Sequence, residues 1–219
     1  MKIAIYGAGG LGREVLMLVQ EINLFKDTFK QITFVVDQPG ENKEIMNIPI
    51  ISFDDFIGFK QYNDFVAIIA VGEPELRRKL YDKLNSNKIQ LTQLIHPTVY
   101  VSPNTVLEDG VIISKGSYIS CNVIIKKNVL VQPNVNIGHD VIIEQNSVIS
   151  GFTNIGGQSS IGSNSFTGLS SVIKDHIRIG NNSIVSMGAV VFRDVDDNTI
   201  VMGNPARTFS NNTEKKVFK

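Results

Sequence analysis

The hydrophobic positions in the second part of the chain recur at every sixth residue. From Ile95 to Val191 each sixth residue is aliphatic, with Thr167 as the exception, and the residue four places after each is small or β-branched. A helix repeats every 3.6 residues and a strand every two, so neither produces this spacing. A period of six is the signature of a hexapeptide-repeat solenoid. We therefore expect short strands stacked in coils about 4.8 Å apart, with Gly, Asn, Asp and Ser at the corners.

The first part of the chain alternates buried strands with helical patterns. A helical pattern follows the glycine-rich residues 7–12, and a second one begins near Gly72. The expected strands are residues 2–6, 32–36, 48–51, 65–71 and 89–94, and residues 38–47 read as a polar loop. This alternation predicts a small parallel α/β domain of Rossmann-like type. We place it at residues 1–94 and the all-β solenoid at 95–219. The polar residues 211–219 are expected to be frayed or to pack on a neighbour.

Composition narrows the class of protein. The 219 residues include 21 Lys and Arg and 21 Asp and Glu, so no net field favours nucleic acid or an acidic membrane. No apolar run approaches the length of about 20 residues that a membrane span needs, and no signal peptide is evident. The single cysteine, Cys121, excludes an internal disulfide framework and suits a reducing cytoplasm. We expect a cytoplasmic protein without nucleic-acid partners or a membrane span.

A glycine-rich loop joins the first strand to the first helical pattern. Gly7, Gly9 and Gly12 form a G-x-G-x-x-G pattern, and Asp37 ends the second strand. Glycines allow backbone N–H groups to approach phosphate at a helix N-terminus, and a carboxylate in the place of Asp37 can accept bonds from a ribose or base. The pattern indicates a nucleotide but does not specify NAD, because a second mononucleotide half is missing. An NAD-linked oxidoreductase and a turn without ligand remain alternatives.

The chain has three histidines, His96, His139 and His176. They occupy different positions within their hexads, and no Cys, Glu or His cluster accompanies them, so we expect no metal site. His139 is followed by Asp140, which can hold the imidazole in one tautomer while the ring accepts a proton. Three hexads beyond His139 lies Gly157. If one coil contains three hexads, stacking brings its backbone N–H to the same corner as His139, where it could face a carbonyl that develops negative charge.

Several motifs resemble one bacterial family. The hexads are similar to those of the left-handed parallel β-helix of hexapeptide acyltransferases, in which three hexads form one triangular coil. GAGGLGREV at 7–15, AVGEPELRRKL at 70–80 and LIHP at 94–97 resemble the N-acetyltransferases of nucleotide-linked 4-amino-sugars and the sialic acid O-acetyltransferases. The resemblance implies that the base is His139 with Asp140, and that Gly157 supplies the oxyanion N–H. It also implies a nucleotide site lined by Gly9, Gly10, Leu11, Asp37 and Gly72.

The same resemblance implies an acetyl-CoA co-substrate and a homotrimer with sites between subunits. The implied CoA contacts are Gly157, Gly168, Ser186, Gly203 and Arg207. Family members often carry His in place of Leu11 and Val148. The predicted function is acetyl-CoA-dependent transfer to the amino group of a nucleotide-linked 4-amino-sugar. O-acetylation of a sugar hydroxyl, the NAD-linked oxidoreductase and a non-catalytic trimeric scaffold are the alternatives.

Overall fold

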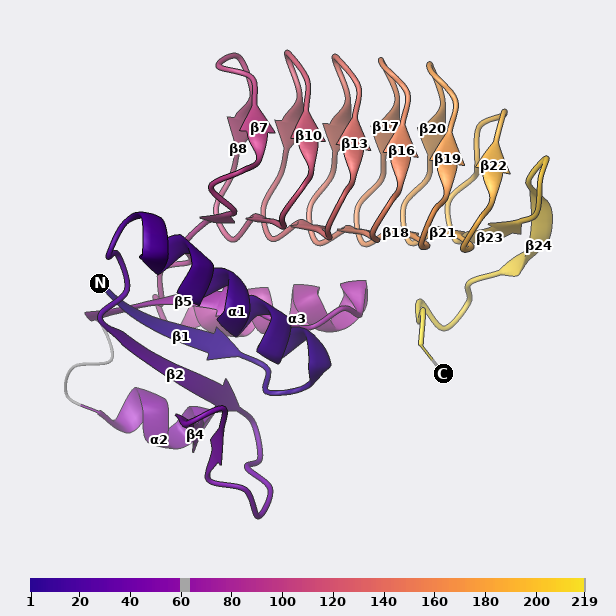
Figure 1. Ribbon diagram of the computed structural model, residues 1–219. Coiled ribbons are helices and arrows are strands. Elements are labelled where there is room, and N and C mark those ends of the chain that lie inside the picture. The colour runs from indigo at the N-terminus through magenta and orange to yellow at the C-terminus, as the bar shows by residue number, and fades with distance from the viewer. Residues whose placement is uncertain (60–63, 219) are drawn as a thin grey trace.

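The computed structural model describes residues 1–59 and 64–218, and its two parts lie side by side. The α/β domain lies against the N-terminal coils of a solenoid whose strands stack in a regular row (Figure 1). The five-stranded sheet has the order β3-β4-β2-β1-β5 and is parallel apart from the β3–β4 pair. Its strands are β1 (Lys2–Tyr6), β2 (Gln31–Val36), β3 (Glu44–Ile45), β4 (Ile48–Ser52) and β5 (Phe65–Ile69).

Helices cover both faces of this sheet. Helix α1 (Gly10–Phe25) packs with Ile3, Ile5 and Ile68 on one face. Helices α2 (Phe53–Gly58) and α3 (Pro74–Ser86) enclose a second core on the other face, and Ser52 caps α2 by accepting the Asp55 N–H at 2.9 Å. The sheet with helices on both faces is the Rossmann-like arrangement that the alternating pattern predicts.

Two details of the α/β domain differ from the sequence expectation. The strand predicted over residues 89–94 is wrong, because only Leu91 bridges β5 before Leu94 and Ile95 leave to pair with the solenoid strand at Ile112 and Ile113. The stretch 38–47, expected to be loop only, contains β3, which pairs with β4 in a short hairpin. Neither two-residue pairing has enough alternation to be seen as a strand in the sequence.

Each coil of the solenoid contributes one two-residue strand to each of three parallel sheets. Residues pair across coils with those 18 positions further on, as Tyr118 does with Asn136. The docking sheet contains β6 (Leu94–Ile95), β9 (Ile112–Ile113), β12 (Leu130–Val131), β15 (Val148–Ile149), β18 (Phe166–Thr167), β21 (Ile184–Val185), β23 (Thr199–Met202) and the antiparallel β24 (Arg207–Asn211).

The other two sheets are equally regular. The tyrosine sheet contains β7 (Tyr100–Val101), β10 (Tyr118–Ile119), β13 (Asn136–Ile137), β16 (Asn154–Ile155), β19 (Val172–Ile173) and β22 (Val190–Val191). The outer sheet contains β8 (Val106–Leu107), β11 (Ile124–Ile125), β14 (Ile142–Ile143), β17 (Ser160–Ile161) and β20 (Arg178–Ile179). The fold is the hexapeptide-repeat left-handed parallel β-helix.

The six-residue period follows from the geometry of a coil. The second residue of each strand pair points inward, and the aliphatic positions of the hexads form one continuous core. Thr167, the polar exception, is fully buried, and its hydroxyl lies 3.4 Å from that of Thr153. Corner residues such as Asn122, Asn128 and Asp140 adopt left-handed backbone angles, which Asn and Asp tolerate better than most residues.

The three corners of the coil matter for the site. The first corner joins the docking sheet to the tyrosine sheet, as at residues 150–153. The second corner joins the tyrosine sheet to the outer sheet, as at 138–141, and the third corner joins the outer sheet to the docking sheet, as at 126–129. Side chains at the same corner of successive coils therefore lie next to one another.

The docking sheet carries the α/β domain. Its outward residues Leu94, Ile112, Leu130 and Val148 are buried in one cluster with Val15 and other residues of α1. About 25 cal/mol is gained for each Å² of apolar surface removed from water, so this stripe attaches the domain to the first coils.

In the described part of the chain, no helix is long and apolar enough to cross a bilayer.

A buried arginine completes the attachment. Arg77 of α3 is inaccessible to solvent, and its guanidinium donates to the carbonyl oxygens of Asn128, Ile69 and Val71 and to Oδ1 of Asn128, at 2.7–3.0 Å. Asn128 returns a bond to the Arg77 carbonyl and continues to Asn146 in the next coil. Burial lowers the pKa of Arg77 to about 9, so the group remains charged at neutral pH.

Replacement of Arg77 should destabilise the junction. Arg77→Ala leaves several buried carbonyl oxygens without a donor and opens a cavity, so we expect the free energy of unfolding to fall by about 3 kcal/mol or more. Urea unfolding measures this loss. The control is Arg78→Ala, which removes exposed ion pairs to Glu75 and Asp82 and should cost about 1 kcal/mol or less. Equal losses in the two variants would contradict the role of Arg77.

Candidate active site

An imidazole–carboxylate pair stands at the second corner, directly after β13. His139 Nδ1 lies 2.7 Å from Oδ2 of Asp140, and Asn122, one coil earlier, donates to Oδ1 of the same carboxylate at 3.0 Å. The bonds from His139 and then Asn122 hold the pKa of Asp140 below its usual range. An ionised carboxylate can only accept, so the Nδ1 proton belongs to the imidazole and the Nε2 lone pair is left free in the neutral ring.

The free nitrogen of this ring lies against Gly157. A Cβ atom at Gly157 would come within 2.6 Å of His139 Nε2, so only glycine fits beside the imidazole in this position. The coils are joined here by the Gln158 N–H, which donates to the His139 carbonyl at 2.8 Å. Within residues 1–59 and 64–218, the Gly157 N–H has no acceptor. The second corner therefore combines a proton acceptor with a backbone donor that is not yet used.

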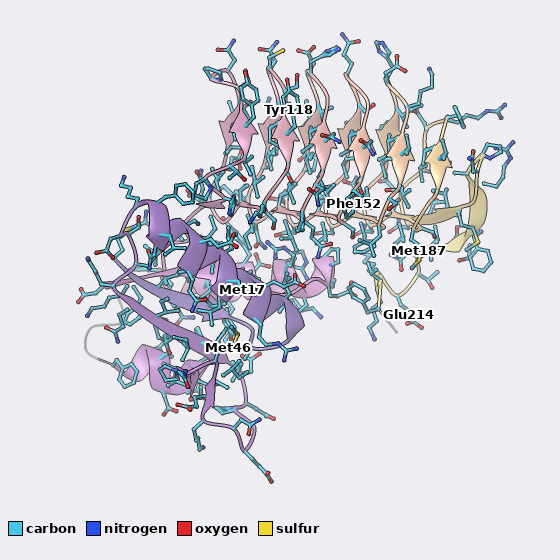
Figure 2. All side chains as sticks on the ribbon, viewed as in Figure 1. Met17, Met46, Tyr118, Phe152, Met187 and Glu214 are labelled. Carbon is cyan, nitrogen blue, oxygen red and sulfur yellow. The ribbon has the colours of Figure 1, made fainter. Side chains whose placement is uncertain are left out.

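A shallow groove extends from His139 over the tyrosine sheet. It has a volume of about 490 Å³, and its lining includes Tyr118, Asn136, Val172 and Lys174. Tyr118 stacks on Tyr100 with ring centroids 5.1 Å apart, and Asn136 donates to Asn154 at 2.9 Å. In Figure 2 Tyr118 lies on the part of the solenoid away from the α/β domain. The exposed face beside His139 is thus partly apolar and wide open.

The glycine loop has the close packing that its sequence requires. Gly7 has φ +117°, and a Cβ there would approach the Ala70 carbonyl oxygen to 2.7 Å. A Cβ at Gly12 would lie only 2.2 Å from the Gly7 oxygen, so α1 and β1 could not pack this closely with a larger residue. Gly9 precedes α1, and among the described atoms none lies within 4 Å of its virtual Cβ. The loop leaves space at Gly9 for a ligand to approach the backbone.

Asp37 lies at the same edge of the sheet but already has partners. It accepts the Tyr6 hydroxyl at 2.6 Å and pairs with the Lys83 ammonium group. The Lys83 bond and then the Tyr6 bond lower the pKa of Asp37, and burial is the main cause that raises the pKa of Tyr6. A ligand at Asp37 would therefore meet a carboxylate whose charge Lys83 partly compensates.

Two other residues of the predicted nucleotide site, Gly72 and Leu11, lie in different surroundings. Gly72 follows β5, and its virtual Cβ would lie 3.7 Å from the ring of Phe218. Leu11 lines a cavity of about 280 Å³ between α1 and the first corner, together with Glu14, His96 and Pro133. Val148, the other position at which the resemblance described above leads us to expect His, is buried against the α/β domain on the docking sheet. The substitution at Val148 thus affects the domain interface and lies on a different face from His139.

The predicted CoA residues lie mainly at the first corner, across the tyrosine sheet from His139. The N–H groups of Gly168 and Ser186 already donate to Val185 and Val201, at 2.7 and 2.9 Å. Gly203 and Arg207 lie at the far end of the solenoid, where Arg207 donates to the Ala206 carbonyl. Within one chain, Gly168 and Ser186 lie at the opposite edge of the tyrosine sheet from His139, whereas Gly157 lies beside it, so the predicted CoA residues do not form a single pocket.

The first corner also exposes apolar side chains. Phe152, Leu169 and Met187 are 58, 53 and 75 % exposed, and they follow one another in successive coils. In Figure 2, Phe152 and Met187 lie along the lower edge of the solenoid, on the same side as the α/β domain. This edge and the second corner are the two borders of the tyrosine sheet.

The other histidines have structural surroundings. His96 is buried, with Nε2 2.7 Å from a Glu21 oxygen of α1, and its Nδ1 accepts the Thr98 N–H at 3.1 Å. His176 is exposed at the second corner, 3.6 Å from Asp175. Within the part of the chain that the structure describes, no three His, Cys, Asp or Glu side chains form a group suited to a metal ion.

Sequence reasoning overlooked Asn122 and Glu73. Asn122 lies 18 residues before Asp140, the spacing of one coil, so the repeat itself contains the signal for this contact. Glu73 binds the backbone of residues 217 and 218 through contacts 144 and 145 residues apart, which no local pattern can indicate.

Family models match both parts of the chain. Residues 2–84 match the PglD N-terminal domain, and residues 158–193 match the hexapeptide repeat of succinyl-transferase. The fold is similar to that of the acetyltransferase domain of PglB from Neisseria gonorrhoeae FA1090, at 25% identity and a TM-score of 0.88, covering 95% of this chain and 99% of that one.

Two further solved structures are comparably similar. WeeI from Acinetobacter baumannii AYE has 26% identity and a TM-score of 0.88, with 95% of this chain and 100% of that chain covered. A mutant perosamine N-acetyltransferase from Caulobacter crescentus, in complex with CoA and GDP-perosamine, has 22% identity and a TM-score of 0.88, with 96% and 98% covered.

The bond from Asn122 makes a testable contribution to the acidity of Asp140. Asn122→Gly keeps the left-handed corner possible but removes the amide donor, so the pKa of Asp140 should rise while the His139 bond still holds it below the ordinary value of 3.8. Because a depressed carboxyl pKa stabilises the fold above the unfolded-state pKa, the stability contributed by this bond should be lost as pH falls through the folded-state value. Carbon-13 NMR of the Asp140 carboxyl during acid titration measures the shift.

The matched control for this measurement is Asn134→Gly. Asn134 has a similar left-handed φ of +59°, but it lies at the first corner. Its replacement should leave the Asp140 titration unchanged. An unchanged titration in Asn122→Gly would contradict the contribution of the amide.

Proposed function

We propose that this chain, an acyltransferase that joins a PglD N-terminal domain to a hexapeptide-repeat β-helix, transfers the acetyl group of acetyl-CoA to the amino group of a nucleotide-linked 4-amino-sugar. The observation that carries the proposal is the second corner, where the free Nε2 of His139 lies against Gly157 and its unused N–H. We place the reaction in the cytoplasm, in keeping with the single cysteine.

The similar structures support the choice of substrates. The PglB acetyltransferase domain was also solved in complex with acetyl coenzyme A, at 25% identity to this chain. The perosamine enzyme, whose likeness extends to the fold, holds CoA and GDP-perosamine. The glycine loop of this chain has the open backbone that a nucleotide phosphate requires, which supports a nucleotide-linked acceptor.

The proposed reaction is a direct attack on the thioester. The amino group of the sugar forms a bond to the acetyl carbonyl carbon, and His139 Nε2 accepts the proton that the nitrogen loses. Asp140 holds the Nδ1 proton and stabilises the imidazolium that results. The Gly157 N–H stabilises the oxyanion of the tetrahedral intermediate. The carbon–sulfur bond then breaks, and the leaving CoA thiolate takes up the proton from the imidazolium, which returns His139 to its neutral form. Because the amine attacks the thioester directly, no acyl-enzyme is needed.

Within one chain the two proposed substrate sites lie apart, because the α/β domain packs on the docking sheet whereas His139 stands at the corner between the other two sheets. We assign the nucleotide to the loops at Gly9, Gly10 and Gly72, with Asp37 and Leu11 at the borders of the site. We assign CoA to Gly157 together with Gly168, Ser186, Gly203 and Arg207, whose guanidinium can pair with a phosphate.

Assembly as a homotrimer would bring the two CoA-binding edges together. The first-corner residues and His139 lie at opposite borders of the tyrosine sheet in one chain. In a ring of three copies, the second corner of one subunit can face the first corner of the next, because head-to-tail contacts must close. The exposed Phe152, Leu169 and Met187 would lie within that interface.

A screen of activated sugars tests the function. The protein is incubated with acetyl-CoA and UDP-, dTDP- or GDP-linked 4-amino-sugars, and mass spectrometry detects the added acetyl group. Matched sugars with a hydroxyl in place of the amino group distinguish N- from O-acetylation. Acetylation of a 4-amino-sugar is the expected result. Transfer only to hydroxyl acceptors, or to none, would refute the proposed reaction.

His139 should be required for chemistry. His139→Ala removes the proton acceptor, and we expect kcat to fall by about 10²–10⁴ with little change in affinity for acetyl-CoA. Steady-state kinetics with the best acceptor measure the effect. His176→Ala is the control: this exposed histidine lies at the same corner one coil beyond Gly157, its side chain is near Asp175, and the variant keeps the backbone N–H that donates to the Gly157 carbonyl. Its turnover should equal that of the wild type. Wild-type turnover in His139→Ala would exclude the assignment.

Activity should depend on assembly. If residues from two subunits form each site, dilution below the dissociation constant of the trimer should abolish activity while the fold of each chain remains. Light scattering and activity are measured over the same range of concentration, and circular dichroism monitors the fold. A species with the mass of one chain that retains full activity would contradict the shared site.

A further inference from the structure

The final described residues form a strap between the solenoid and the α/β domain. We call residues 212–218 the tail. Asn212 is buried, its N–H donates to the Asn198 carbonyl at 2.7 Å, and its side chain donates to the Asn182 carbonyl at 2.9 Å. It also accepts the N–H of Lys216 at 3.1 Å. The expectation of a frayed end is therefore wrong for these residues, which pack on their own chain.

The other end of the tail is bound by an acidic side chain. The Val217 and Phe218 N–H groups donate to the Glu73 carboxylate at 3.0–3.1 Å. Glu73 follows Gly72 and precedes α3. Hydrogen bonds from N–H groups to an ionised carboxylate are stronger than neutral ones, so they fix the tail beside the loop after β5. In Figure 2, Glu214 of this segment lies below the solenoid. Figure 1, in the same view, shows that α3 is close to this position.

This position places an aromatic ring at the predicted nucleotide site. The Phe218 ring meets the Phe166 ring edge to face, with centroids 5.6 Å apart, and lies 3.7 Å from the virtual Cβ of Gly72. Phe218 nevertheless remains 59 % exposed, so part of its ring can accept a ligand.

The two loops beside Phe218 open at the same edge of the sheet. Strands β1 and β5 are parallel neighbours, and the Ala70 N–H donates to the Tyr6 carbonyl just before the glycine loop begins. Phe166 is the fifth outward residue of the docking sheet, beyond the four buried by the α/β domain, and it packs at the border of the cluster that includes Ala8 and Leu11. The aromatic pair thus lies beside the loop after β5, at the edge of the sheet where the glycine loop also opens.

We propose that Phe218, held by Phe166 and by the Glu73 bond to the tail, forms an aromatic wall of the acceptor site and stacks on the base or sugar ring of a nucleoside diphosphate sugar. This inference rests on the proposed function for the identity of the ligand. The glycines can bind phosphate but offer little apolar surface, whereas a ring face binds bases and the apolar faces of sugars. Phe218 is therefore a specificity-determining residue, and the tail contributes directly to the acceptor-binding site.

Binding of free nucleotides tests the wall without requiring turnover. Isothermal titration of UDP, GDP and dTDP is compared for the wild type, Phe218→Ala and Phe218→Tyr. Loss of one ring should weaken the preferred nucleotide about tenfold, and Tyr should restore affinity. Phe209→Ala is the matched control, because this ring on β24 is 65 % exposed and should not affect binding. If only the sugar ring stacks, the loss appears with nucleotide sugars and not with free diphosphates.

A chain that ends at Asn212 provides the second variant. The loss of residues 213–219 in this variant should raise KM for the sugar nucleotide and leave KM for acetyl-CoA unchanged. Unchanged affinity for both free nucleotides and nucleotide sugars, in this variant and in Phe218→Ala, would overturn the proposal. Tighter binding in both variants would also overturn it and would show that the tail blocks the site. Acetylation without any nucleotide binding would refute the proposed role of Phe218 but would be compatible with the transferase function. Nucleotide binding that depends on Phe218, with no acetylation, would refute the function alone.

Discussion

The backbone hydrogen bonds between successive coils determine the geometry on which the candidate site depends. Each coil repeats after 18 residues, so side chains far apart in the sequence become neighbours at one corner. This register brings Gly157 to the His139 ring and Asn122 to Asp140. A shift of a single residue would turn the inward aliphatic side chains outward, so the buried core strongly specifies the register. The arrangement at the second corner is thus maintained by a core that takes no direct part in it.

The same regularity explains how the α/β domain is held. Four outward apolar residues of the docking sheet bury one face against α1, and Arg77 joins α3 to the third corner through Asn128. Apolar burial supplies attraction without direction, whereas the planar guanidinium bonds only in one orientation. Together they set the glycine loop at a defined place relative to the coils.

The two borders of the tyrosine sheet divide the proposed chemistry. The imidazole lies at the second corner with the Gly157 N–H, which has no acceptor among the residues that the structure describes, and the exposed apolar side chains lie at the first corner. The flat face between them is only partly covered by its own side chains, with the stacked Tyr100 and Tyr118 and the Asn136–Asn154 pair. A flat solenoid face of this kind can be used by a partner copy without rearrangement of the coils.

The sequence by itself determined the solenoid, the α/β order and the His139–Gly157 relation, because each depends on a period or a local motif. The six-residue repeat specifies the coil, and three hexads separate the two residues that meet. Contacts between distant segments leave no such period. Only the tertiary structure decided that Val148 lies in the domain interface, that Asp37 is paired with Lys83, and that Glu73 binds residues 217 and 218. Each of these follows from how whole domains and the tail pack, which single residues and their spacing do not encode.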